Sequence, residues 1–181
     1  MRLILYISAG LILLSYILTF IIRKVALKHS LLDIPNERSS HEIPTPRGGG
    51  VAIVTSWFLG ISLLWYFDLI ETNLFLALLC GIILAIVSFI DDVFTLPPFV
   101  RLNAQFLSAI LALIFLKDIT PVSISGVNIG NHFFLYPVVL IGIVWFINLF
   151  NFLDGIDGYA SLETLTVSLA LLLFTKDSLN V

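Results

Sequence analysis

The chain has 181 residues, of which 59% are hydrophobic and 12% are charged, and its formal net charge at pH 7 is −3. With a mean hydropathy of +1.09, this composition excludes an ordinary soluble domain and is typical of an integral membrane protein. The acidic balance and the lack of a basic stripe exclude a nucleic-acid partner, and a single cysteine, Cys80, excludes a disulfide framework. We expect one membrane domain over residues 1–181.

Six apolar stretches are candidates for membrane spans. About 20 residues of helix are needed to cross the hydrocarbon core of a bilayer. In chain order the stretches cover residues 3–22, 48–67, 74–90, 102–116, 133–150 and 164–175. The fourth is extended by the residues around Arg101, whose side chain can snorkel, and the sixth is the shortest. The pattern predicts an all-α polytopic membrane protein with about six transmembrane helices.

The segment between the fourth and fifth stretches has a different pattern. Residues 119–132 alternate apolar and polar side chains and contain a Gly-Asn pair. Such alternation is typical of a strand, and Gly-Asn is a turn signal. We therefore predict a small extracytoplasmic β-hairpin here.

The basic residues predict the orientation of the chain. When alternate loops are counted, six of the nine Lys and Arg residues fall on one side of the membrane. These six are Arg23, Lys24, Lys28, Arg38, Arg47 and Arg101. The positive-inside rule makes this side cytoplasmic and places the N-terminus outside. The polar motifs of the chain then share the cytoplasmic face.

The first motif, residues 41–50, opens the second apolar stretch. Its prolines stiffen the backbone, and its glycines expose N–H groups near a helix start, where phosphates bind well. Arg47 is able to add a bidentate phosphate contact. The alternative, a Pro-Gly linker with small residues for helix packing, is equally well supported by this segment alone.

The second motif is the pair Asp91 and Asp92 at the end of the third apolar stretch. Adjacent carboxylates repel each other unless a cation or a proton compensates them. A solvated helix terminus is the alternative, but the negative end of the helix dipole disfavours carboxylates there. The pair therefore indicates a functional site.

The third motif follows the fifth apolar stretch. Asn148, Asn151, Asp154 and Asp157 recur at every third residue, and a glycine follows each aspartate. On a helix the first three share a face, and oxygen-rich side chains beside flexible backbone suit a hard cation or a phosphorylated ligand. A polar turn with helix caps accounts for one such residue but not for four in register.

Together these motifs resemble the polyprenyl-phosphate N-acetylhexosamine-1-phosphate transferase family (glycosyltransferase family 4). The resemblance is carried by His-x-x-Pro-x-Pro-x-Gly-Gly at 41–49, by Asp91-Asp92, and by Asn-x-x-Asn-x-x-Asp-Gly-x-Asp-Gly at 148–158. Residues 32–41 look most like the branch that initiates surface polysaccharides. Family members continue through further spans, with a later Gly-Asp motif and a basic loop. We therefore expect this chain to be the N-terminal part of a longer fold, with little activity by itself.

The resemblance implies a reaction at the cytoplasmic face of the bacterial inner membrane. UDP-N-acetylhexosamine and undecaprenyl phosphate give undecaprenyl-diphosphate-N-acetylhexosamine and UMP, with Mg²⁺ as the cofactor and Mn²⁺ as an alternative. The expected partners are these two substrates and the lipid bilayer, and a homodimer is also expected. No nucleic acid is expected to bind.

The resemblance also implies roles for individual residues. Asp91 is expected to deprotonate the lipid phosphate, Asp92 to support catalysis and the metal, and Asn151 to bind the metal. The expected substrate-binding residues are His41, Arg47, Asn148, Asp154 and Asp157.

Two other classes of protein remain open. A lipid or ion transporter also places carboxylates on membrane helices, but those groups are expected near the middle of a span. Here the span centres carry no charge, and the acidic residues lie at the ends. The second alternative is a truncated, non-catalytic membrane protein, because loss of a distal half leaves the motifs above unchanged.

Overall fold

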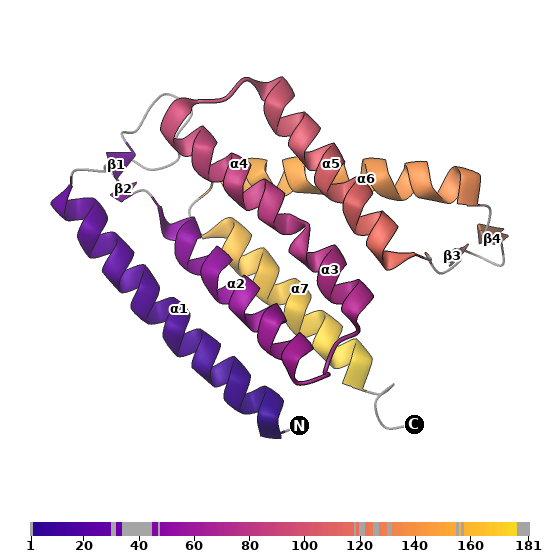
Figure 1. Ribbon diagram of the computed structural model, residues 1–181, viewed down its shortest axis with the longest axis horizontal. Coiled ribbons are helices and arrows are strands. Elements are labelled where there is room, and N and C mark those ends of the chain that lie inside the picture. Colours follow the sequence, from indigo (N-terminus) through magenta and orange to yellow (C-terminus); the bar gives the residue numbers. More distant parts are fainter. Residues whose placement is uncertain are drawn as a thin grey trace.

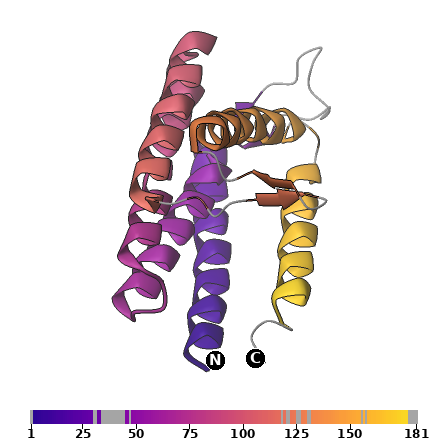
Figure 2. The same cartoon turned by 90° about the vertical axis from the view of Figure 1, so that its right-hand side faces the viewer.

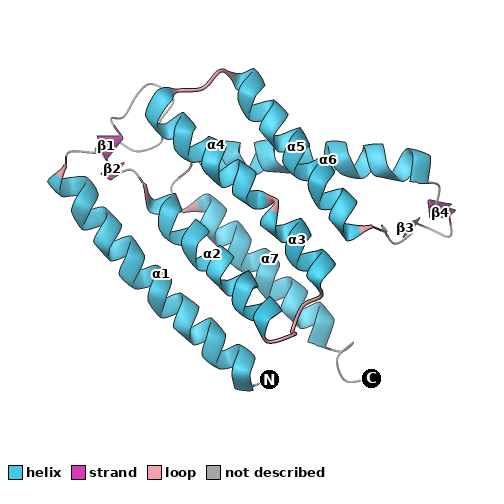
Figure 3. Ribbon diagram, viewed as in Figure 1, coloured by secondary structure: helices cyan, strands magenta, loops and turns pink. Residues whose placement is uncertain are grey.

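The computed structural model describes residues 2–29, 32–33, 45–46, 48–117, 119, 122–124, 127–129, 132–154, 156 and 158–176. Three predicted site residues, His41, Arg47 and Asp157, lie outside the described residues. Helices dominate the described chain (Figure 3). Their bounds are α1 Arg2–Lys28, α2 Gly49–Tyr66, α3 Thr72–Leu79, α4 Gly81–Phe94, α5 Pro98–Leu116, α6 His132–Leu153 and α7 Tyr159–Lys176.

The described residues contain five helical stretches that are long and apolar enough to cross a membrane. They are Arg2–Lys28, Gly49–Tyr66, Thr72–Phe94, Pro98–Leu116 and Phe133–Leu153. The apolar part of α7, Tyr159–Phe174, is shorter. The chain is therefore a multi-pass, almost entirely helical membrane protein, and a sixth span stays a prediction.

The third predicted span consists of two helices, α3 and α4, which meet at Cys80. Gly81 starts α4, and glycine is a weak helix former. At this junction the Ser108 hydroxyl of α5 donates a 2.9 Å hydrogen bond to the Cys80 carbonyl oxygen. A polar side chain from a neighbouring helix thus binds the backbone where the span is interrupted.

Two pairs of short antiparallel strands lie in the connections. β3 (Val122–Ile124) pairs with β4 (Val127–Ile129) within the segment for which a hairpin is predicted. Residues 125 and 126 between them lie outside the described residues, and the side of the membrane on which the pair lies stays a prediction. A second pair, β1 (Leu32–Asp33) with β2 (Thr45–Pro46), is not predicted from the sequence.

The helices are arranged so that the motif residues share one end of the molecule. In Figure 1 the axes of α1, α2, α3–α4 and α5 are similarly inclined, and the start of α1 and the end of α7 lie near each other at the lower end. Figure 2 shows α6 nearly end-on, crossing the others, with α7 on the side away from α3 and α5. The end of α4 and the start of α5 form one corner of the molecule. We call this corner, together with the end of α6, the polar end.

Helix α5 connects this arrangement through one polar face. Arg101, Gln105 and Ser108 are spaced i, i+4 and i+7, and therefore lie on the same side of the helix. Gln105 and Ser108 are 8% and 5% exposed. Each of the three residues binds a different partner: Asp91 of α4, Asn148 of α6 and the Cys80 carbonyl. Polar contacts as well as apolar packing therefore set the position of α5.

Helices α1 and α2 approach closely at Gly60, where a Cβ atom would lie 2.9 Å from Leu11 Cδ1. We expect Gly60→Ala to lower the melting temperature in detergent slightly, because the leucine end can rotate, and Gly60→Val to lower it strongly. Gly142→Val is a control of the same size, since a Cβ there meets nothing within 4 Å. Equal melting temperatures for the two valine variants would contradict the close approach.

Candidate functional site

The turn between α4 and α5 is organised by Asp91. Its Oδ1 accepts a 2.6 Å hydrogen bond from the Leu96 backbone N–H, and its Oδ2 lies 3.3 Å from Arg101 Nη1. The Asp91 carbonyl also accepts from the N–H of Thr95, which adopts a left-handed conformation with φ 50°. Pro97 precedes α5 as its N-cap, and Pro98 is the first residue of the helix, where proline is tolerated. The Asp91 carboxylate at a helix C-terminus is thus balanced by Arg101.

Asp91 and Asp92 line a cavity of about 520 Å³ at the polar end. Its walls come from α2, α4, α5 and α6. Its polar lining residues are Ser88, Asp91, Asp92, Arg101, Gln105, Asn151 and Asp154. The structure therefore brings together both aspartates of the second motif and two residues of the third, more than 50 positions away along the chain.

Asn148 has a different position from the other residues of its motif. It is not among the residues that line the cavity. Its Nδ2 donates to Gln105 Oε1 at 2.6 Å and to the Val144 carbonyl at 2.8 Å, and its Oδ1 accepts from Gln105 Nε2 at 3.3 Å. These contacts join α5 to α6 about one helical turn before Asn151.

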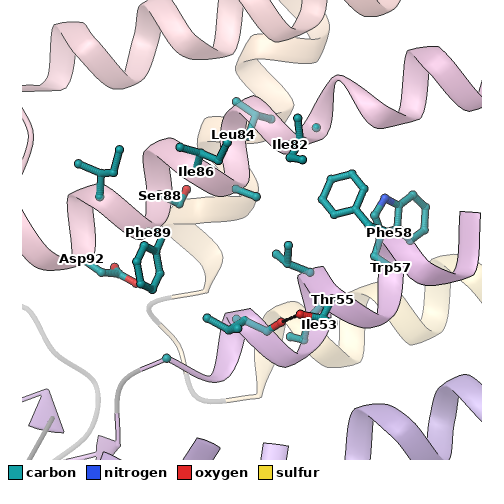
Figure 4. Close-up of a pocket in the computed structure, with 17 residues that line it drawn as sticks. Ile53, Thr55, Trp57, Phe58, Ile82, Leu84, Ile86, Ser88, Phe89 and Asp92 are labelled. Carbon is teal, nitrogen blue, oxygen red and sulfur yellow. Dashed lines mark hydrogen bonds between the residues drawn. The ribbon is translucent and has the colours of Figure 1, made fainter. Parts of the chain in front are cut away.

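An apolar groove of about 720 Å³ runs between α2 and α4 (Figure 4). Trp57 of α2 and Phe89 of α4 belong to its lining, and Asp92 lies at one end. The groove and the polar cavity share four lining residues: Ile53, Leu84, Ser88 and Asp92. An apolar compartment and a polar compartment therefore meet at Asp92.

The cavity offers oxygen ligands to a cation. Asp92, Asn151 and Asp154 line it, and oxygen donors are the ones that Mg²⁺ prefers. Within the described parts of the chain, no group of three or more His, Cys, Asp or Glu side chains is placed to hold a metal ion. Mg²⁺ usually takes only one or two protein carboxylates and completes its shell with water and substrate phosphates, so the chemistry of this donor set fits it.

Gln105 is a cavity residue that the sequence analysis missed, and the pairing of Arg101 with Asp91 was missed as well. The available signal was the i, i+4 spacing of two polar residues on an otherwise apolar helix. Gly158, with φ +73°, does adopt the left-handed conformation that only glycine takes easily. It allows the chain to bend between α6 and α7.

Comparisons with known proteins match the part of the chain that forms the cavity. Residues 74–180 match the family described as glycosyl transferase family 4. Undecaprenyl-phosphate alpha-N-acetylglucosaminyl 1-phosphate transferase of Thermotoga maritima is 33% identical over 153 residues, 82% of this chain and 45% of that protein. The Escherichia coli (strain K12) protein of the same name is 31% identical over 144 residues, 77% of this chain and 38% of that protein.

A Bacillus subtilis protein, "Probable undecaprenyl-phosphate N-acetylglucosaminyl 1-phosphate transferase", is 26% identical over 147 residues, 80% of this chain and 40% of that protein. The chain thus spans less than half the length of these relatives. No solved structure matches it. Because the family match covers more than half of the chain, including both Asp91-Asp92 and the motif at the end of α6, the protein belongs to glycosyl transferase family 4.

Proposed function

We propose that the protein transfers N-acetylhexosamine 1-phosphate from a UDP-sugar to undecaprenyl phosphate, releasing UMP. An oxygen of the lipid phosphate attacks the sugar-bound phosphorus, and the bond from that phosphorus to UMP breaks. The proposed location is the cytoplasmic face of the bacterial inner membrane, and the product would initiate a surface polysaccharide. Family membership and the names of the relatives support this reaction.

The observation that carries the proposal is the junction of the groove and the cavity at Asp92. Undecaprenyl phosphate has a long apolar chain and a charged head, so it needs an apolar compartment next to a polar one. The groove between α2 and α4 offers the first, and the cavity with Arg101 offers the second. A polar soluble substrate alone would not account for the apolar groove.

The cavity also suits the charge of the reaction. Two phosphorylated substrates must meet among carboxylates, which requires compensating positive charge. We propose that Asp92, Asn151 and Asp154 hold Mg²⁺, or Mn²⁺ in its place. When bound, the cation would neutralise charge on the diphosphate and on the departing UMP. Arg101, whose side chain is 40% exposed, adds positive charge at the same place.

Within the aspartate pair, the geometry favours Asp92 for the chemistry. Asp92 lines both compartments, whereas Asp91 lines only the cavity. The two Asp91 oxygens bind the Leu96 N–H of the turn and Arg101 of α5. We therefore assign proton transfer or cation binding to Asp92. Asp91 is assigned a structural role: it holds the α4–α5 turn and so positions Asp92. The resemblance implies proton transfer by Asp91; this proposal moves that role to Asp92 and keeps the metal role of Asp92. The substrate contacts expected of His41, Arg47 and Asp157 stay predictions.

UMP release tests the proposed function. Because residues 1–181 by themselves are expected to have little activity, the assay uses membranes that express them joined to the remaining part of the Escherichia coli relative. These membranes should release UMP from UDP-N-acetylglucosamine only when both undecaprenyl phosphate and Mg²⁺ are present, because the lipid is the nucleophile and the cation balances charge. EDTA should stop the release, and added Mg²⁺ should restore it. Membranes without the protein are the control. Release that needs no lipid, or no release above the control, would contradict the proposal.

A further inference from the structure

Gln105 is a buried polar side chain that lies against the polar cavity. It is 8% exposed and lines the cavity beside Arg101, one helical turn earlier on the same face of α5. Burial of an amide inside an apolar helix bundle is costly unless its hydrogen bonds are made. Its bonding pattern therefore indicates what it offers to a ligand.

The orientation of the Gln105 amide can be derived from the Val144 carbonyl, which binds Asn148, the partner of Gln105. The Val144 carbonyl can only accept, so the group of Asn148 that faces it at 2.8 Å is the Nδ2 amide. Asn148 then presents Oδ1 to Gln105 Nε2 and its Nδ2 to Gln105 Oε1. A flip of either amide would place two donors or two acceptors together, so the pair has one favoured orientation.

The two amides differ in what remains unbonded. Each carries two N–H donors and one oxygen. Both N–H groups of Asn148 are used, on Gln105 Oε1 and on the Val144 carbonyl. Gln105 uses one N–H, on Asn148 Oδ1, and no second acceptor for its Nε2 is found among the described residues. The residue with the remaining donor is also the one that lines the cavity.

We propose that Gln105 contacts the substrate by donating its second Nε2–H to a phosphate oxygen, and that Asn148 is a positioning residue that fixes the orientation of this donor. The inference rests on the proposed function, since a phosphorylated ligand must enter the cavity. Hydrogen bonds to an ionised oxygen are stronger than neutral ones. The phosphate belongs either to the lipid acceptor or to the UDP-sugar.

Equilibrium binding to the chain in lipid nanodiscs tests the proposal, with undecaprenyl phosphate and UDP-N-acetylglucosamine titrated separately in the presence of Mg²⁺. Gln105→Met keeps the approximate size of the side chain and removes the donor. It should raise the Kd for one ligand by about tenfold to a hundredfold, the usual effect of losing a hydrogen bond to a charged group. The ligand affected identifies the source of the phosphate.

A double-mutant comparison separates contact from positioning. Asn148→Ala should weaken binding of the same ligand in the wild-type background and have no further effect in the Gln105→Met background, because it acts only through Gln105. The exchange variant Gln105→Asn/Asn148→Gln keeps the combined side-chain length. Compared with the single variants, it should recover the melting temperature of the wild type. It should not recover the affinity for the ligand, because the amide on α5 is one methylene shorter and no longer reaches the ligand.

Four results would overturn the inference. Wild-type affinity in Gln105→Met, or recovery of affinity together with melting temperature in the exchange variant, would leave the pair a purely structural link. A further loss on adding Asn148→Ala to Gln105→Met would show that Asn148 itself touches the ligand. Failure of the wild-type chain to bind either ligand would contradict the proposed function, and this inference with it.

Discussion

Asp92→Asn should lower UMP release by on the order of a hundredfold to ten-thousandfold, the usual contribution of a residue that transfers a proton in the reaction. Asparagine keeps the size of the side chain and removes the charge needed to accept a proton or bind a cation. Among the described residues, Asp92 is the one carboxylate that lines both the groove and the cavity, so we expect no neighbouring carboxylate to replace it at the junction. Initial rates of UMP release at saturating substrate measure the effect.

Asp68→Asn is a matched control for the Asp92 variant. Asp68 is exposed in the connection between α2 and α3, away from the cavity, and its φ of 54° is one that asparagine also tolerates. It should leave both the rate and the melting temperature unchanged. Near-normal UMP release by Asp92→Asn, at wild-type expression, would refute the assignment of chemistry to this carboxylate.

Asp91→Ala, in contrast to Asp92→Asn, should have its largest direct effect on the free energy of unfolding. It removes the acceptor for the Leu96 N–H and the partner of Arg101. An unsatisfied donor costs about 1–3 kcal/mol, and loss of a partly exposed ion pair adds up to about 1 kcal/mol. Asp91→Asn retains an acceptor for Leu96 and should lose less. Reversible unfolding in mixed detergent micelles measures the free energies.

The comparison that decides this prediction is with Asp92→Ala. That variant removes a neighbouring carboxylate of the same size and leaves the bonds of Asp91 to Leu96 and Arg101 in place. We expect its free energy of unfolding to fall by less than that of Asp91→Ala. If both alanine variants unfold with the same free energy, Asp91 has no special part in the turn.

The sequence predicted the helices well because a membrane span must be long and continuously apolar. It did not predict the interruption at Cys80, since Cys80 and Gly81 are themselves compatible with an apolar stretch. The feature that distinguishes the junction is the Ser108 hydroxyl on another helix. The β1–β2 pair was missed for a related reason, because strands of two residues are too short to show alternation.

The shared location of Asp91, Asp92, Asn151 and Asp154 was predicted from their places at helix ends, and the polar cavity contains all four. The position of Asn148 was not predicted. Its three-residue spacing from Asn151 suggests an equivalent role. In the structure, however, Asn148 is bound by the buried amide of Gln105 on the adjacent helix α5. Contacts between residues 43 positions apart leave no periodic signal in either segment.

The short α4–α5 connection has a consequence for the order of assembly. Asp91 and Arg101 are only 10 residues apart, and closing so small a loop costs little chain entropy. Local contacts of this kind form quickly, so α4 and α5 can pair as a helical hairpin during synthesis, before α6 has emerged. The carboxylates of the second motif would then already be in place when Asn151 and Asp154 arrive, and α6 would dock on a preformed half of the cavity.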